Sequence, residues 1–191
     1  MRGWMIVSAA VTALALTVVA VATAPDATRI TASFPVSGSV GQTLVSRQLT
    51  VNATGVRLAK QLDTVYADAG NTTSDGIWLI VDADVTPGLD LIGLAYATAS
   101  IGGVEYRASG ILPAPSLAIV PFGPGVTYHG TLVFEVPTSA IESAAAARTT
   151  VAFNFALEPK LDSVPVVDVD LRGVSVDAVA SIDAPYVVAT K

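Results

Sequence analysis

The chain of 191 residues contains no cysteine. This absence excludes disulfide bonds, a lipid-modified cysteine and any thiolate metal site. A folded domain in this chain must therefore be held together by its hydrophobic core alone. The part of the chain beyond its first 24 residues is long enough to bury one such core.

Histidine and methionine are almost as scarce. His129 is the only histidine, and the two methionines are Met1 and Met5. A three-histidine zinc site and a histidine-thioether copper site are thereby excluded. A Ser-His-Asp hydrolase would have to use His129, yet no serine lies in a G-x-S-x-G turn, and no glycine-rich stretch fits a phosphate-binding loop. We expect His129 to be a surface loop residue, and we expect no cofactor.

Charged residues make up only 14% of the chain, and 16 acidic residues against 10 basic ones give a net charge of −6. A surface of this sign disfavours the phosphate backbone, so we expect no nucleic-acid partner.

An uncharged run extends from Met5 to Ala24. As a helix it would span about 30 Å, the thickness of the hydrocarbon core of a bilayer. Trp4 lies at its inner edge, and Arg2 before it favours a cytoplasmic amino terminus. We therefore expect residues 5–24 to be a single-pass anchor in the lipid bilayer of the cell membrane, with the rest of the chain extracytoplasmic. The alternative is a signal peptide cleaved after its small residues, which would leave a secreted domain.

Beyond this segment, residues 25–34 lack periodicity and are expected to form a stalk. Residues 35–172 alternate apolar and polar positions over short stretches separated by turn-forming residues. Seven or eight such strands predict an all-β fold, an immunoglobulin-like antiparallel β-sandwich, with a partly closed barrel as the alternative. The tail, residues 173–191, either adds an edge strand or hangs loose.

The strand patterns assign each side chain to one face of a sheet. Gly55 interrupts the alternation, which predicts a β-bulge there. Gly102-Gly103 predicts a tight hairpin turn, and "TSAIESAAAA" predicts one short helical turn that Ser139 would cap. The residues expected to face inward on the other strands are Leu49, Val51, Ala53, Val56, Leu58, Leu132, Phe134, Val136, Val151, Phe153, Phe155, Leu157, Val167, Val169 and Leu171.

The stretch "GIWLIVDADV" predicts a central strand with two unlike faces. Its apolar face carries Ile77, Leu79, Val81, Ala83 and Val85. The opposite face carries Trp78, Ile80, Asp82 and Asp84, which we expect to face water, with Trp78 half exposed or under a loop. Packing of Trp78 into the core instead stays open.

Asp168 and Asp170 form a second aspartate pair on a later strand. If the strands of Asp82, Asp84, Asp168 and Asp170 were neighbours, four carboxylates would converge and could hold Ca²⁺. We prefer plain solvated aspartates, because calcium sites usually draw on loops and backbone carbonyls as well. The long loop over residues 110–130 is rich in proline and glycine, and its Ile119, Val120, Phe122 and Tyr128 are a possible contact surface. We expect these residues to tuck back onto the sandwich instead.

The chain resembles the telokin-like, immunoglobulin-fold extracytoplasmic proteins of Gram-positive, particularly actinobacterial, bacteria. The resemblance rests on "SVGQTLVSRQLTVNATGVRLA", "DGIWLIVDADVTP", "YHGTLVFEVP" and "LDSVPVVDVDL", and covers roughly residues 38 to 172. It implies a membrane-associated sandwich without an assigned activity, and it supplies no catalytic residue.

The sequence therefore predicts a non-catalytic membrane protein that displays this domain to a protein or cell-envelope partner, or that serves as an accessory subunit of a membrane complex. The alternatives are a cell-envelope hydrolase that uses paired carboxylates and a calcium-stabilised secreted binding domain.

Overall fold

The computed structural model describes most of the chain, in six stretches. These are residues 2–23, 31–64, 72–88, 93–110, 116–157 and 159–189. The chain divides into two compact units, Met1–Ala32 and Ser33–Lys191. The first unit contains one long helix, and the second contains all the strands of the described residues.

The helix of the first unit, α1, runs over Arg2–Thr23. Trp4 is exposed on it, and Ala24, the expected outer end of the anchor, lies outside the described residues. In the described part of the chain, no helix is both long and apolar enough to span a membrane. Only residues 31–34 of the expected stalk are described.

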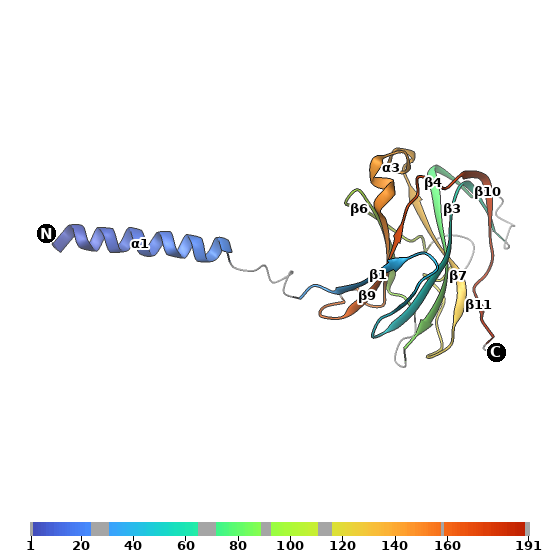
Figure 1. Cartoon of the computed structure of the whole chain (residues 1–191), viewed down its shortest axis with the longest axis horizontal. Helices are drawn as coiled ribbons and strands as arrows, with labels where there is room; N and C mark the ends of the chain where they lie inside the picture. Colours follow the sequence, from blue (N-terminus) through green and yellow to red (C-terminus); the bar gives the residue numbers. More distant parts are fainter. Residues whose placement is uncertain are drawn as a thin grey trace. The chain divides into compact units, whose positions relative to one another are not determined.

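The second unit is a β-sandwich, as the sequence predicts (Figure 1). One sheet has the strand order β1-β9-β8-β5-β6, and the other has the order β10-β3-β4-β7-β11, with β2 paired to β3. The strands are β1 (Phe34–Ser39), β2 (Thr43–Val45), β3 (Leu49–Thr64), β4 (Thr72–Pro87), β5 (Tyr96–Ile101), β6 (Val104–Arg107), β7 (Tyr128–Val136), β8 (Thr149–Asn154), β9 (Ser163–Val169), β10 (Val176–Ile182) and β11 (Tyr186–Val187). The described residues thus form eleven strands rather than seven or eight.

Two strand pairs are parallel, so the expectation of a wholly antiparallel sandwich was wrong. Strand β1 pairs with β9, and β10 pairs with β3, each in parallel. A hairpin imposes antiparallel pairing, but strands that are distant in sequence are free to pair either way. Both parallel pairs join a strand from one end of the domain to a strand far along the chain.

The main hydrophobic core lies between the two sheets. The apolar face of β4 is buried in it, which confirms the predicted orientation of Ile77, Leu79, Val81, Ala83 and Val85. The other predicted inward residues in this core are Leu49, Val51, Ala53, Leu58, Leu132, Phe134, Val136, Val151, Phe153, Val167, Val169 and Leu171. Leu157 is an exception, because β8 already ends at Asn154 and Leu157 is exposed in the following turn.

The predicted bulge at Gly55 is present. Ala53 pairs with Ala83, but Gly55 pairs with Asp82, so one residue of β3 is left over between the two pairs. A second shift follows, because Ala59 pairs with Trp78 whereas Gln61 pairs with Thr73. Such irregularities bend a strand, and the far end of the β3–β4 hairpin therefore departs from a flat sheet.

A second apolar cluster covers part of the outer face of the six-stranded sheet. Trp78 and Ile80, expected on the wet face, are buried there against Leu62, Ala180 and Ile182. The last two residues belong to β10, in the carboxyl-terminal tail. The sequence predicted the two faces of β4 correctly. The side chains that cover Trp78 and Ile80, however, belong to a strand about 100 residues further along the chain.

The predicted turns are present with one change. Gly102 and Gly103, with φ of +61° and +83°, join β5 to β6 as the hairpin turn that the sequence predicts. The helical stretch forms as α3 (Thr138–Ile141) and the 3₁₀ helix η1 (Ala144–Arg148). Ser139 lies inside α3 and does not cap it, because the helix already begins one residue earlier.

Candidate functional site

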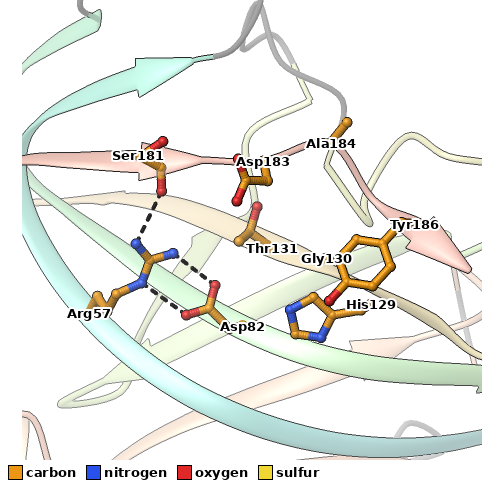
Figure 2. A pocket seen from close by; sticks show the side chains of 9 residues that line it. All are labelled: Arg57, Asp82, His129, Gly130, Thr131, Ser181, Asp183, Ala184 and Tyr186. Atoms are coloured by element: carbon orange, nitrogen blue, oxygen red, sulfur yellow. Dashed lines mark hydrogen bonds and ion pairs between the residues drawn. The ribbon is translucent and has the colours of Figure 1, made fainter. Parts of the chain in front are cut away.

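A pocket lies on the outer face of the six-stranded sheet, under the carboxyl-terminal tail (Figure 2). Its volume is about 350 Å³. Strands β3, β4 and β7 form its floor, and the segment from β10 to β11 forms its opposite wall. We call it the outer-face pocket, and its lining residues are Arg57, Asp82, His129, Gly130, Thr131, Ser181, Asp183, Ala184 and Tyr186.

The bulge at Gly55 explains how Arg57 reaches this face. Odd-numbered residues of β3, such as Val51 and Ala53, face the core before the bulge, and Leu58 faces it afterwards. Without the extra residue, Arg57 would point into the core. A Cβ at Gly55 would lie 3.4 Å from Asp82 Oδ2, in ordinary van der Waals contact.

Arg57 and Asp82 form a bidentate ion pair on the pocket floor. Arg57 Nε donates to Asp82 Oδ2 and Nη2 donates to Oδ1, each at 2.9 Å. The remaining nitrogen, Nη1, donates to the backbone oxygen of Ser181 at 3.1 Å. Bidentate guanidinium–carboxylate pairs fix geometry as well as charge. Arg57 thus ties the tail to the sheet, and both oxygens of Asp82 are engaged.

His129 lies on strand β7, so its prediction as a surface loop residue was wrong. Its Nδ1 lies 2.7 Å from Asp84 Oδ1, and both side chains are partly exposed. The His129 ring contacts the ring of Tyr186, with centroids 5.1 Å apart and planes tilted by 38°. Asp84 therefore orients a histidine that in turn supports the tyrosine of β11.

Thr131 supplies a buried hydroxyl to the pocket. The residue is only 5% exposed, and its Oγ1 has no hydrogen-bond partner in the described structure. Figure 2 shows this side chain pointing from β7 toward the tail segment. A buried hydroxyl without a partner destabilises a fold by about 1–3 kcal/mol. Among the described residues, Asn52 Oδ1 and Trp78 Nε1 are buried without a partner as well, but neither residue lines this pocket.

The two aspartate pairs do not converge. Asp82 and Asp84 lie on β4 of one sheet, whereas Asp168 lies on β9 of the other, followed by Asp170. Across the described residues, no cluster of three or more histidine, cysteine, aspartate or glutamate residues has the arrangement of a metal site. The condition for a four-carboxylate calcium site is therefore not met.

Asp170 has its own partner. Arg172 donates from Nε and Nη2 to the two carboxylate oxygens at 3.0 and 2.7 Å. These hydrogen bonds, with one from the Arg172 backbone, lower the pKa of Asp170 to about 2. The pair is exposed and lies outside the outer-face pocket, so we assign it no part in a site there.

The loop expected as a possible contact surface folds back onto the sandwich where it is described. Phe122 is buried in the main core, and Val120 packs against that core. Tyr128 lies on β7, where its ring contacts Phe122 and its hydroxyl accepts a hydrogen bond from Gly123 N at 2.8 Å. Ile119 is the exposed member of the four.

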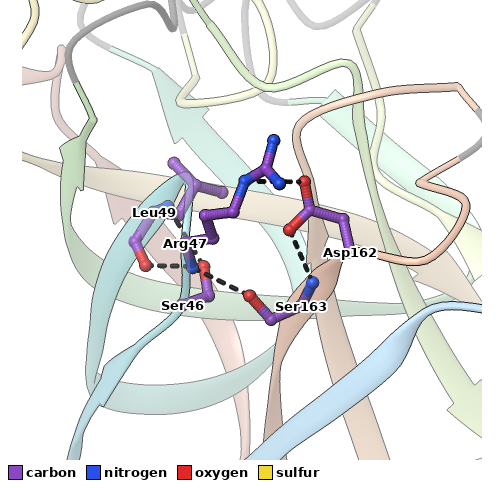
Figure 3. A network of polar contacts seen from close by, with 5 residues as sticks. All are labelled: Ser46, Arg47, Leu49, Asp162 and Ser163. Atoms are coloured by element: carbon purple, nitrogen blue, oxygen red, sulfur yellow. Dashed lines mark hydrogen bonds and ion pairs between the residues drawn. The ribbon is translucent and has the colours of Figure 1, made fainter.

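A second polar network, outside the outer-face pocket, joins the two sheets (Figure 3). Arg47, between β2 and β3, forms an ion pair with Asp162 at 3.4 Å, and its backbone nitrogen donates to Ser163 Oγ at 2.8 Å. Ser46 closes the adjoining turn, since its hydroxyl donates to the Leu49 oxygen at 2.7 Å. All these groups satisfy one another, which indicates a structural role.

Comparison with known proteins gives similarity at the level of structure only. No protein-family model matches the chain, and no curated protein sequence matches it. A secreted protein of Mycobacterium tuberculosis, MPT63, is 16% identical, with 72% of this chain and 100% of that chain covered and a TM-score of 0.47.

Two further solved structures are similar to the chain. An uncharacterized β-sandwich protein of Clostridium difficile is 11% identical over 71% of this chain and 95% of its own, with a TM-score of 0.46. The yjhA protein of Bacillus subtilis is 13% identical over 68% and 99%, with a TM-score of 0.45. At these values the likeness carries no argument about family or activity.

Sequence reasoning identified Asp82 and also Asp84, the partner of His129, but missed most of the residues that line the pocket. Arg57 was within reach, because the bulge that turns it outward is visible in the alternation. Thr131 sits on a predicted strand, but its burial depends on the tail above it. Asp183 and Tyr186 belong to a segment whose docking has no local signal, since its pairing partners are far away in sequence.

Proposed function

We propose that this protein is a non-catalytic binding module that works outside the cytoplasm and contacts its partner through the outer-face pocket. The observation that carries the proposal is the pocket itself. Two strands of the tail dock on opposite edges of one sheet and enclose polar side chains from five strands. A sandwich needs one dry face per sheet, and this second, covered face is an addition.

The proposed extracytoplasmic location rests on the sequence. Arg2 followed by the uncharged run over residues 5–24 is typical of a segment that directs export. The finer proposal is that this segment stays as a single-pass anchor; removal as a signal peptide is the alternative. Intact-mass analysis of the protein from its native membranes, with carbonate extraction, separates the two. The relation to immunoglobulin-fold extracytoplasmic proteins is likewise proposed from the quoted motifs.

Binding is better supported than hydrolysis. A carboxylate-dependent hydrolase needs two carboxyl groups in one concave site with unlike environments. Asp82 and Asp183 do share the pocket, and Asp183 is exposed. However, both oxygens of Asp82 already accept hydrogen bonds from Arg57. A carboxylate held in this way is poorly placed to act as a base or nucleophile.

Site-directed photocrosslinking tests the proposal. A photoreactive amino acid replaces Asp183 at the pocket or, as the control, Glu105, which is exposed on the opposite sheet. The full-length protein is crosslinked in intact native cells and its adducts are analysed by mass spectrometry. We expect a reproducible adduct from position 183 only. Equal adducts from both positions, or none from position 183, would refute the pocket as the contact site.

A further inference from the structure

We infer that the outer-face pocket binds a small saccharide of one or two sugar units. This inference deepens the proposed function and rests on it. A volume of about 350 Å³ lies at the lower end of the ~300–1,000 Å³ range of small-ligand sites. The pocket is therefore the right size for a ring-sized ligand.

The lining excludes simpler ligands. A free anion would face the carboxylates of Asp82 and Asp183, while the guanidinium of Arg57 is already occupied by Asp82 and the Ser181 oxygen. A metal ion would face that same guanidinium, and the described residues contain no cluster of metal ligands. An apolar ligand would leave the Thr131 hydroxyl buried without a partner. A neutral ligand that both donates and accepts hydrogen bonds meets all three conditions.

Sugar hydroxyls have this double capacity. Each hydroxyl donates one hydrogen bond and accepts others, as the threonine hydroxyl does. Thr131 Oγ1 would gain a partner from one ligand hydroxyl, and the exposed carboxylate of Asp183 would accept from another. A saccharide hydroxyl placed there would thus give Thr131 Oγ1 the hydrogen-bond partner that it lacks among the described protein groups.

Tyr186 provides the apolar part of the site. The residue is 56% exposed, yet its ring is supported on one side by His129. Aromatic rings with a free apolar face and a polar tip pack well against ligands that are apolar on one face and polar at the edge. The C–H face of a sugar ring is such a surface. Asp84, His129 and Arg57 then act as positioning residues, because they hold the tyrosine and the tail in place.

The key variant is Thr131→Val, which keeps the branched shape of the side chain and removes its hydroxyl. Losing one hydrogen bond to the ligand should weaken binding about tenfold, which corresponds to about 1.4 kcal/mol. The same variant removes an unpartnered buried hydroxyl, so its melting temperature should stay equal or rise. If Thr131 had only a structural role, the Thr131→Val substitution would cause no loss of saccharide binding. Thr98→Val, on β5 of the other sheet, is the matched control.

The experiment uses the full chain in a detergent without a sugar headgroup. Calorimetric titrations use glucose, galactose, mannose, N-acetylglucosamine and disaccharides of each, with sodium phosphate and calcium chloride as comparison ligands. We expect at least one saccharide to bind with a Kd below about 5 mM, the Thr131→Val and Tyr186→Ala variants to weaken it about tenfold or more, and Thr98→Val and Tyr186→Phe to retain it.

Three results would overturn the inference: no saccharide binds, only phosphate or calcium binds, or saccharide binding is unchanged in Thr131→Val and Tyr186→Ala. The photocrosslinking experiment separates this failure from that of the proposed function. A protein adduct at position 183 without saccharide binding would leave a binding module with the wrong ligand class. Absence of both would refute the module as well.

Discussion

The carboxyl-terminal tail should be an integral part of the fold, and Ile182→Ala tests this directly. Ile182 lies on β10 and is 1% exposed. It packs in the second apolar cluster, on the outer face of the six-stranded sheet, with Trp78 and Ile80 of β4. If the tail docks as the structure has it, truncating this side chain leaves a cavity above the sheet.

The expected loss of stability follows from the size of the deletion. Isoleucine to alanine removes three carbon atoms, and at about 0.8 kcal/mol for each the transfer contribution is roughly 2.4 kcal/mol. A residual cavity adds to this, so we expect about 3 kcal/mol, within the 2–5 kcal/mol usual for such changes. For a domain of this size, a loss of about 3 kcal/mol lowers the melting temperature by roughly 6–12 °C.

The assay is urea unfolding of the full chain, followed by the fluorescence of tryptophan, together with a thermal melt. The control is Val179→Ala, on the same strand but 44% exposed, which should change the free energy of unfolding by less than about 0.5–1 kcal/mol. Equal, small effects of the two substitutions would refute the docking of β10. A loss from Ile182→Ala alone would establish that the tail belongs to the cooperative unit.

Two further predictions concern sites away from the pocket. Gly76→Ala should destabilise the domain by more than about 1 kcal/mol, because its Cβ would lie 2.3 Å from the backbone oxygen of Val136, whereas Gly173→Ala, with no atom within 4 Å, should be nearly neutral in the same unfolding assay. An NMR titration should give Asp170 a pKa of about 2, and Arg172→Ala should return it toward 3.8. Because folding lowers this pKa, the pair's contribution is present above pH 3.8 and is lost as the pH falls toward 2; an unchanged pKa in the variant would contradict the assigned cause.

Local patterns predicted the faces of the strands well. The alternation over residues 77–85 placed Leu79 and Val81 in the core and Asp82 outside it, as the structure has them. The irregularity at Gly55 correctly indicated a bulge. These predictions succeed because side chains on a strand alternate between its faces with a period of two. A shift of that alternation by one residue, as at Gly55, indicates a local change of register.

Two of the failures involve segments that pair at long range. Local sequence contains no information about which edge of a sheet a distant strand will join, so parallel pairing of β10 with β3 was not predictable. The burial of Trp78 was not predicted for the same reason, because the residues that cover this side chain belong to the carboxyl-terminal tail. His129 was misplaced because the proline- and glycine-rich loop before it concealed the start of β7.

The sequence by itself therefore determined an uncharged amino-terminal segment, a β-sandwich stabilised without disulfides, the outward direction of Asp82 and the bulge that precedes Arg57. Only the tertiary structure decided that these two residues form the floor of a pocket. The hydrogen bond from Arg57 to Ser181 joins residues 124 positions apart. Contacts over such a separation are fixed by the fit of whole sheet faces and edges, which no short stretch of sequence specifies.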